Sequence, residues 1–370
     1  MEEITFLKGL TCLLLWGLVY LVICPASRFP YRLSKPGRVL GFILILLFCL
    51  YPYWGGDYFH SMHSFEDIKA GEYNHLEDIY GWIISWAPSY TLYRFIVWGT
   101  ALSILFIAYK RVGNNFDLSL FYFGALYMQR FSYARASLAM AIILFGMTII
   151  YKPFKKHKFL SYFLGALVIC CSEFFHRSAL VGILSAFGTL ALIKNSRKKI
   201  LLLFVFVPFS ATLVSYMLGN MLDMSFEAID ASIDGKLERY TSGESGERGI
   251  ASRISMILQN IPMYLSVFAF LILTIKNKIV KFTMIERSFA YYMFIIMLIV
   301  IGLSMDIGYN TDVIAQRVMC FAMPANAVFL MSMKTYKNDN RLFYVIYYMA
   351  LASCIYALMY ATYMGYNRSF

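Results

Sequence analysis

Long apolar runs, separated by short clusters of charge, recur from one end of the chain to the other. The runs are continuous and close to the length of about 20 residues that crosses a bilayer, without the alternation typical of strands. In lipid, backbone polar groups must find partners within the protein, so such runs predict helices. The twelve predicted spans are residues 4–24, 39–54, 88–109, 116–131, 134–151, 159–175, 178–193, 200–218, 256–275, 288–304, 318–333 and 342–363.

The charged clusters predict which side of the membrane each connection faces. Of the 33 Lys and Arg residues, 21 lie in alternate connections, at residues 25–38, 110–115, 152–158, 194–199, 276–287 and 334–341. Positively charged connections stay on the cytoplasmic side, so with twelve spans we expect both termini outside. The acidic start of the chain and the basic residues after the first span favour an uncleaved span over a signal peptide.

The composition agrees with a polytopic, all-α integral membrane protein. The chain is 60% hydrophobic and 15% charged, whereas soluble domains are about a quarter charged. Because the basic residues concentrate in the predicted cytoplasmic connections, the net charge of +12 reflects topology, and we expect no nucleic-acid partner. The seven cysteines lie in or beside apolar runs without metal-binding spacing, so we predict neither a disulfide framework nor a metal site.

We expect a single membrane domain over residues 1–370 with two larger segments on the outer face. The first, residues 55–87, is acidic, and apolar residues at three-residue spacing favour a short helix on the membrane surface. The second, residues 219–253, combines helical apolar spacing with a glycine-rich stretch. It is shaped like a lid over an outward cavity, although a helix resting on lipid explains the pattern equally well.

Arginines on the outer face are the most informative polar residues. Basic residues are disfavoured there, yet the chain places nine arginines on that side, namely Arg94, Arg130, Arg135, Arg177, Arg239, Arg248, Arg253, Arg317 and Arg368. Guanidinium groups form paired hydrogen bonds with phosphates and carboxylates, so an anionic ligand would explain the excess. For single arginines, pairing with local carboxylates is an equal alternative, as for Arg177 with Glu173 or Arg317 with Asp312.

Few outer side chains offer acid–base chemistry. His176 stands beside Arg177 at a predicted membrane interface, where a neighbouring cation and partial burial favour the neutral imidazole that a general base requires. A hydrogen-bonded structural histidine is the other interpretation. Asp57, Glu77 and Asp78 are alternative bases, or ligands of a divalent cation. We find no Ser-His-Asp arrangement and no nucleotide-binding glycine motif, and we expect no cofactor.

The order of these short motifs along one face resembles the EpsG-like branch of the Wzy-type polysaccharide polymerases of bacterial envelopes. The matching residues are Gly56-Asp57-Tyr58, Glu77 with Tyr80, Arg130, Arg135-Ala136, His176-Arg177-Ser178-Ala179, Arg239-Tyr240 and Arg317. One motif departs from the family pattern, since Glu77-Asp78 stands where a Glu-Pro pair is expected.

The resemblance implies a glycosyltransferase that polymerises O-antigen, exopolysaccharide or capsule repeat units in the bacterial inner (cytoplasmic) membrane, with its active site facing outward. Its substrates would be oligosaccharides linked to undecaprenyl diphosphate, and the growing chain would pass to the non-reducing end of an incoming repeat unit. A flippase and a chain-length regulator would be its protein partners.

The resemblance also implies roles for the outer residues. The diphosphate-binding residues would be Arg130, Arg135, Arg177, Arg239 and Arg317. The catalytic candidates would be His176, which ranks first as the base, followed by Asp57 and Glu77. Residues 219–249 would cover the bound sugars.

Three other interpretations remain open. A GT-C-type glycosyltransferase would add one sugar from a polyprenyl-phosphate donor and use an acidic residue of the first outer segment as its base. A lipid-linked oligosaccharide flippase, or another transporter, would place ionisable groups near the membrane midplane. The predicted spans are nearly free of charge at that depth, which favours chemistry over transport. An O-antigen-ligase-like enzyme would differ from a polymerase in its acceptor.

Overall fold

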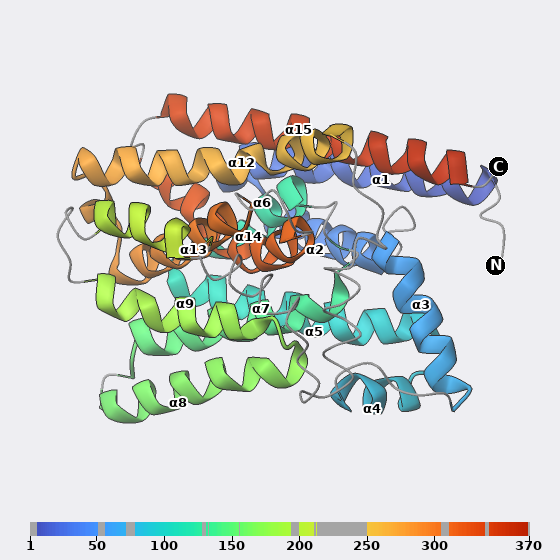
Figure 1. Ribbon diagram of the computed structural model, residues 1–370, viewed down its shortest axis with the longest axis horizontal. Helices are drawn as coiled ribbons and strands as arrows, with labels where there is room; N and C mark the ends of the chain where they lie inside the picture. Colours follow the sequence, from blue (N-terminus) through green and yellow to red (C-terminus); the bar gives the residue numbers. More distant parts are fainter. Residues whose placement is uncertain are drawn as a thin grey trace, which may run out of the picture.

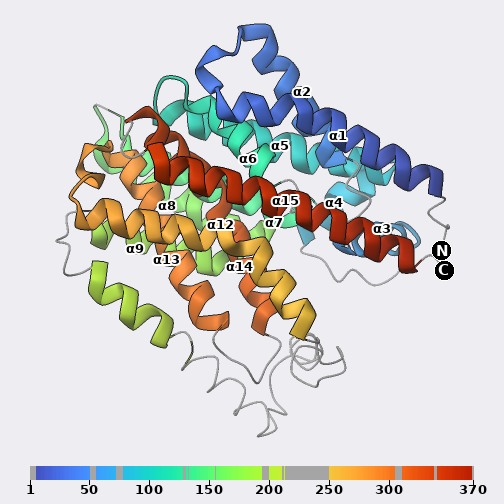
Figure 2. The same cartoon turned by 90° about the horizontal axis from the view of Figure 1, so that it is seen from above.

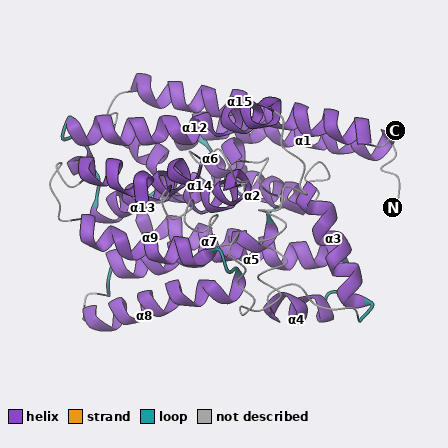
Figure 3. Ribbon diagram, in the orientation of Figure 1, coloured by secondary structure: helices purple, strands orange, loops and turns teal. Residues whose placement is uncertain are grey.

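The computed structural model describes residues 6–50, 56–71, 78–127, 131, 133–154, 156–193, 200–210, 212, 250–304, 311–336 and 340–368. Every regular element in these residues is a helix (Figures 1 and 3). The all-helical fold is therefore confirmed for this part of the chain. The possible lid predicted at 219–253 lies outside the described residues, except for its end from residue 250 onward.

Each predicted span contains a helix among the described residues. They are α1 (Phe6–Arg28), α2 (Lys35–Leu50), α5 (Tyr90–Val112), α6 (Ser119–Tyr127), α7 (Ala134–Tyr151), α8 (Lys158–Cys171), α9 (Ala179–Leu192), the helix Ile200–Ser210, α12 (Ile250–Ile275), α13 (Met284–Ser304), α14 (Thr311–Thr335) and α15 (Asn340–Arg368). The first outer segment contains α3 (Gly56–Lys69) and α4 (Asp78–Trp86). Short 3-10 turns are η1 (Pro30–Arg32), η2 (Phe116–Leu118), η4 (Ser172–Phe175) and η5 (Ile279–Lys281).

Five helical segments of the described chain are long and apolar enough to cross a membrane. They are Tyr90–Val112, Ala134–Tyr151, Lys158–Phe175, Met284–Ser304 and Ile314–Thr335. Shorter apolar helices accompany them, which is consistent with an integral membrane protein. Twelve crossings, and termini on the outer side, stay predictions.

The helices of the bundle run mostly along its long axis, and α3 and α4 lie at one end of it (Figures 1 and 2). The first turn of α1 and the last turn of α15 lie at this same end. We call it the α3–α4 end. Helices α5, α7, α9 and α14 all point their N-terminal ends toward it, so their positive dipole ends face the same side.

Three helices form the centre of the bundle. The apolar windows of α7 and α14 are each 83% buried and that of α13 is 72% buried, whereas that of α8 with η4 is only 22% buried. Helix α7 packs against α5, α8, α9 and α14, and α13 pairs with α14. A helix that is apolar on every side, such as α7, suits a position surrounded by protein.

Helices α7 and α8 approach each other at a pair of glycines. A Cβ atom at Gly146 would lie 2.8 Å from the carbonyl oxygen of Gly165, and one at Gly165 would lie 3.0 Å from the carbonyl oxygen of Gly146. Small residues let membrane helices pack by direct backbone contact. This contact seats α8 on α7, and η4, which follows α8, also packs against α7.

The apolar stripe of α3 faces the protein. The buried ring of Phe65 lies against Tyr90 and Tyr93 of α5, with ring centroids 5.7 and 5.9 Å apart. Met62 and Ile68 are partly buried on the same core. Aromatic rings at the start of α5 thus provide an apolar partner for the stripe that we had expected to rest on the membrane surface.

Candidate functional site

A buried arginine joins three segments at the α3–α4 end. Arg94, in the second turn of α5, is fully buried. Its Nε and Nη2 atoms donate to the carbonyl oxygen of Cys49 at 3.0 and 2.6 Å, and Nη2 also donates to the carbonyl oxygen of Phe131 at 2.8 Å. Carbonyls in the last turn of a helix lack partners within the helix. Arg94 supplies the missing hydrogen-bond donor to the carbonyl of Cys49, in the last turn of α2. Its bond to the carbonyl of Phe131 holds the segment that leads into α7.

Aromatic rings enclose the same guanidinium group. The rings of Tyr58 in α3 and Tyr90 in α5 have their centroids 5.0 and 5.8 Å from its Cζ atom. The Tyr90 hydroxyl donates to the carbonyl oxygen of Tyr58 at 3.2 Å. Rings and carbonyls together stabilise a buried cation. Arg94 is therefore a structural residue that holds α3 on α5.

Arg135 lies in the first turn of α7, beside α4. The hydroxyl of Tyr80, a buried residue of α4, donates to its carbonyl oxygen at 2.8 Å. The Arg135 side chain is partly buried. A helix N-terminus carries a partial positive charge. A guanidinium group at this position therefore raises a local positive potential that an anion would neutralise.

His176 and Arg317 are related through one phenylalanine. The ring of His176, between η4 and α9, stacks on Phe321 of α14, with centroids 6.4 Å apart and planes inclined by 11°. Arg317 precedes Phe321 by about one helical turn, so it lies on the same face of α14, nearer the helix start. Both His176 and Arg317 are partly buried. The highest-ranked base candidate therefore contacts the helix face that carries a predicted diphosphate-binding arginine.

The elements that carry these residues pack together. Turn η4 contacts α4, α7 and α9, and α14 contacts α7 and α9. Arg135, His176 and Arg317 therefore lie on adjoining elements at the α3–α4 end. We call these three residues the His176 cluster. Two guanidinium groups and an imidazole on adjoining elements are suited to bind an anion together.

A glycine controls the packing beneath this cluster. A Cβ atom at Gly182 of α9 would lie 2.7 Å from Cδ1 of Ile143, 3.0 Å from the hydroxyl oxygen of Tyr292 and 3.1 Å from Cδ1 of Phe321. Helices α7, α9, α13 and α14 thus meet around a position without a side chain. A side chain at this position would press on Phe321, the residue on which the His176 ring stacks.

The other predicted site residues are less defined. Arg177 is exposed, and within the described chain it forms no ion pair with Glu173, the local partner that its spacing suggests. Asp57 is the second residue of α3, and its side chain lies outside what the structure describes. Three of the predicted site residues, Glu77, Arg130 and Arg239, lie outside the described ranges altogether. Among the described residues, no group of three or more His, Cys, Asp or Glu could hold a metal ion.

Two residues that organise the site were not found by sequence reasoning. Arg94 was counted among the outer arginines without a role. Its signal was its position as the seventh residue of the predicted span 88–109, where a charge must find partners inside the protein. Phe321 carries no such signal, because it is one of 32 phenylalanines, most of them in apolar runs.

Comparison with known families places nearly the whole chain in one of them. Residues 36–368 match the EpsG family. The match includes every residue of the predicted site. Neither the curated proteins nor the solved structures contain a match to the chain.

Proposed function

The chain belongs to the EpsG family, and on that premise we propose that it is a repeat-unit polymerase of a bacterial polysaccharide. The proposed donor is a growing oligosaccharide on undecaprenyl diphosphate at the outer face of the cytoplasmic membrane. The proposed acceptor is the non-reducing end of a lipid-linked repeat unit. The observation that carries the proposal is the placement of Arg135, His176 and Arg317 on adjoining elements at one end of the bundle.

The proposed reaction is a single glycosyl transfer in each cycle. An acceptor hydroxyl oxygen attacks the anomeric carbon of the donor sugar, and a new C–O bond forms as the bond from that carbon to the diphosphate oxygen breaks. The hydroxyl proton passes to a base, and the lipid diphosphate leaves with the electron pair of the broken bond. Because the donor already carries an activated bond, the step requires no nucleotide.

The His176 cluster supplies the groups that this step needs. The stacked, partly buried imidazole of His176 would receive the proton, with Asp57 and Glu77 as the alternative bases. Negative charge grows on the leaving diphosphate, and preorganised guanidinium groups stabilise it strongly where water is excluded. Arg135 and Arg317 take this role in the proposal, together with Arg130, Arg177 and Arg239.

Reconstitution tests the proposal directly. Purified protein in nanodiscs would receive the cognate undecaprenyl-diphosphate repeat unit, and products would be resolved by mass. We expect a ladder with steps of one repeat unit. A product longer by one sugar, or substrate recovered unchanged from a folded sample, would contradict the polymerase and point to single-sugar transfer or to transport.

A valine at Gly182 should impair this activity. The new side chain must displace Phe321, Tyr292 or Ile143, and a shift of Phe321 moves the support of the His176 ring. We expect Gly182→Val to lower the rate of ladder formation by about tenfold or more, because small displacements of catalytic groups are costly. Rates would be measured in the reconstituted assay, alongside the melting temperature.

Gly188 on the same helix provides the matched control for this prediction. A Cβ atom there meets only the flexible Cδ1 atom of Ile295, at 3.3 Å. Gly188→Val should therefore retain most of the activity. Equal rates for the two valine variants would show that the Gly182 contact does not position the site.

A further inference from the structure

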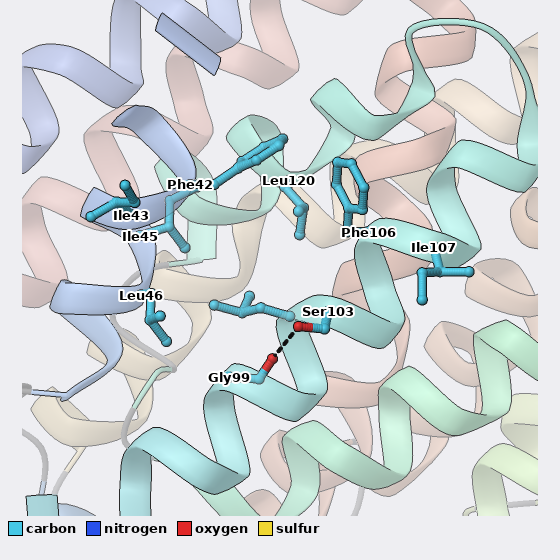
Figure 4. Close-up of a pocket in the computed structure, with 10 residues that line it drawn as sticks. Phe42, Ile43, Ile45, Leu46, Gly99, Ser103, Phe106, Ile107 and Leu120 are labelled. Carbon is cyan, nitrogen blue, oxygen red and sulfur yellow. Dashed lines mark hydrogen bonds between the residues drawn. The ribbon is translucent and has the colours of Figure 1, made fainter. Parts of the chain in front are cut away.

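A groove lies between α2 and α5, and two of its lining residues, Ile43 and Ile107, are each 49% exposed (Figure 4). Its volume of about 340 Å³ falls in the range of roughly 300–1,000 Å³ that ligand pockets occupy. Phe42 and Leu46 line it from α2, and Gly99, Leu102 and Phe106 line it from α5. The groove therefore runs along the contact between the two helices.

The walls of the groove suit an apolar chain. Its one polar lining side chain, Ser103, donates its hydroxyl to the carbonyl oxygen of Gly99 at 2.7 Å (Figure 4), so it requires no partner from a ligand. No atom lies within 4 Å of the place where a Cβ atom of Gly99 would stand. The missing side chain therefore widens the groove.

The groove begins just inward of the Arg94 contact. Gly99 follows Arg94 by about one and a half turns of α5, and Leu46 precedes Cys49, whose carbonyl Arg94 binds, by about one turn of α2. The α2–α5 contact thus runs from the α3–α4 end into the groove. A molecule with its polar head at that end would have its apolar part at the level of the groove.

We infer that the groove holds the polyisoprenoid chain of the lipid diphosphate substrate, an inference that rests on the proposed function. Bilayer lipid is as apolar as the groove, so apolar character alone does not select an occupant. A chain whose diphosphate is held at the His176 cluster is different, because its entry into the groove is an intramolecular step favoured by high effective concentration. The arginines select the head, and the groove directs the chain that follows it.

Photo-crosslinking tests this inference without requiring catalysis. A benzophenone side chain would replace Ile43, which lines the groove and is 49% exposed, or Phe163 of α8, which is 58% exposed and lies outside the groove. Full-length protein in phosphatidylethanolamine nanodiscs containing undecaprenyl diphosphate would be irradiated, and its adducts would be identified by mass spectrometry. We expect about tenfold more polyprenyl adduct at position 43 than at position 163. Equal labelling, or phospholipid as the main adduct at position 43, would overturn the inference.

Two glycine variants in the Ile43-labelled protein separate the groove from general effects of bulk. Gly99→Trp should fill the groove and remove most of the polyprenyl adduct. Gly17→Trp on α1, where a Cβ atom likewise meets nothing within 4 Å, should leave the adduct unchanged. An adduct that persists in Gly99→Trp would exclude the groove as the binding site of the polyisoprenoid chain. Selective polyprenyl crosslinking at position 43 without a product ladder in the reconstituted assay would contradict the polymerase and support the lipid site. A product ladder without selective crosslinking would support the polymerase and contradict the lipid site.

Discussion

Replacing Arg135 by alanine is expected to slow chain growth by about 100-fold or more while the protein still folds. The guanidinium group is proposed to stabilise the charge on the departing diphosphate, and loss of one preorganised donor of this kind costs about 10²–10³ in rate. The hydrogen bond from Tyr80 goes to the backbone carbonyl of Arg135. The α4–α7 contact should therefore survive the substitution.

The measurement is the rate and length of the product ladder, with the melting temperature as the test of folding. Arg135→Lys should be partly active, because an ammonium group keeps the charge but cannot form the paired contacts of a guanidinium. Arg32→Ala, at an exposed residue near the opposite end of α1, should behave as wild type. Wild-type chain lengths from Arg135→Ala would remove this residue from the proposed site.

Replacing Arg94 by methionine should cause the largest loss of stability. The substitution leaves the carbonyls of Cys49 and Phe131 buried without their donor, and each such group costs about 1–3 kcal/mol. It also removes the cation between Tyr58 and Tyr90. We expect a loss of about 3 kcal/mol or more in the free energy of unfolding, seen as a lower melting temperature in detergent.

Arg177→Met is the control for the Arg94 prediction, because Arg177 is exposed at the same end of the bundle. Its melting temperature should match that of the wild type. Arg94→Lys should fall between the two, since one ammonium group cannot reproduce the fork that binds both carbonyls. If Arg94→Met and Arg177→Met have the same melting temperature, the buried hydrogen-bond network of Arg94 does not stabilise the fold.

The sequence predicted the helical segments well, because a bilayer imposes helices on apolar runs. The predicted span 134–151 coincides with α7, and the predicted span 178–193 differs from α9 by one residue at each end. Helix α1 extends four residues beyond residue 24, where the first predicted span ends. In this last turn of α1 the hydroxyl of Ser27 donates to the Cys24 carbonyl oxygen at 2.8 Å and lies 2.7 Å from the Tyr347 hydroxyl of α15, so the turn packs against α15.

The candidate site was predicted as a set of residue types rather than as an arrangement. Outer arginines are conspicuous in a sequence because basic residues are disfavoured on that face. Their patterns do not separate Arg94, which uses its donors inside the protein, from Arg135 and Arg317, which lie on elements that adjoin His176. That separation depends on contacts between distant segments, such as the stacking of His176 on Phe321.

The sequence by itself therefore determined that the described part of the chain is helical and where its helices lie. Only the tertiary structure decided which helices are central. Helices α7 and α8 are both apolar, yet one is enclosed and the other faces outward. In a membrane, lipid is as apolar as a protein interior, so hydrophobicity does not distinguish these positions. Close packing does, as at Gly182, where α9 meets side chains of α7, α13 and α14.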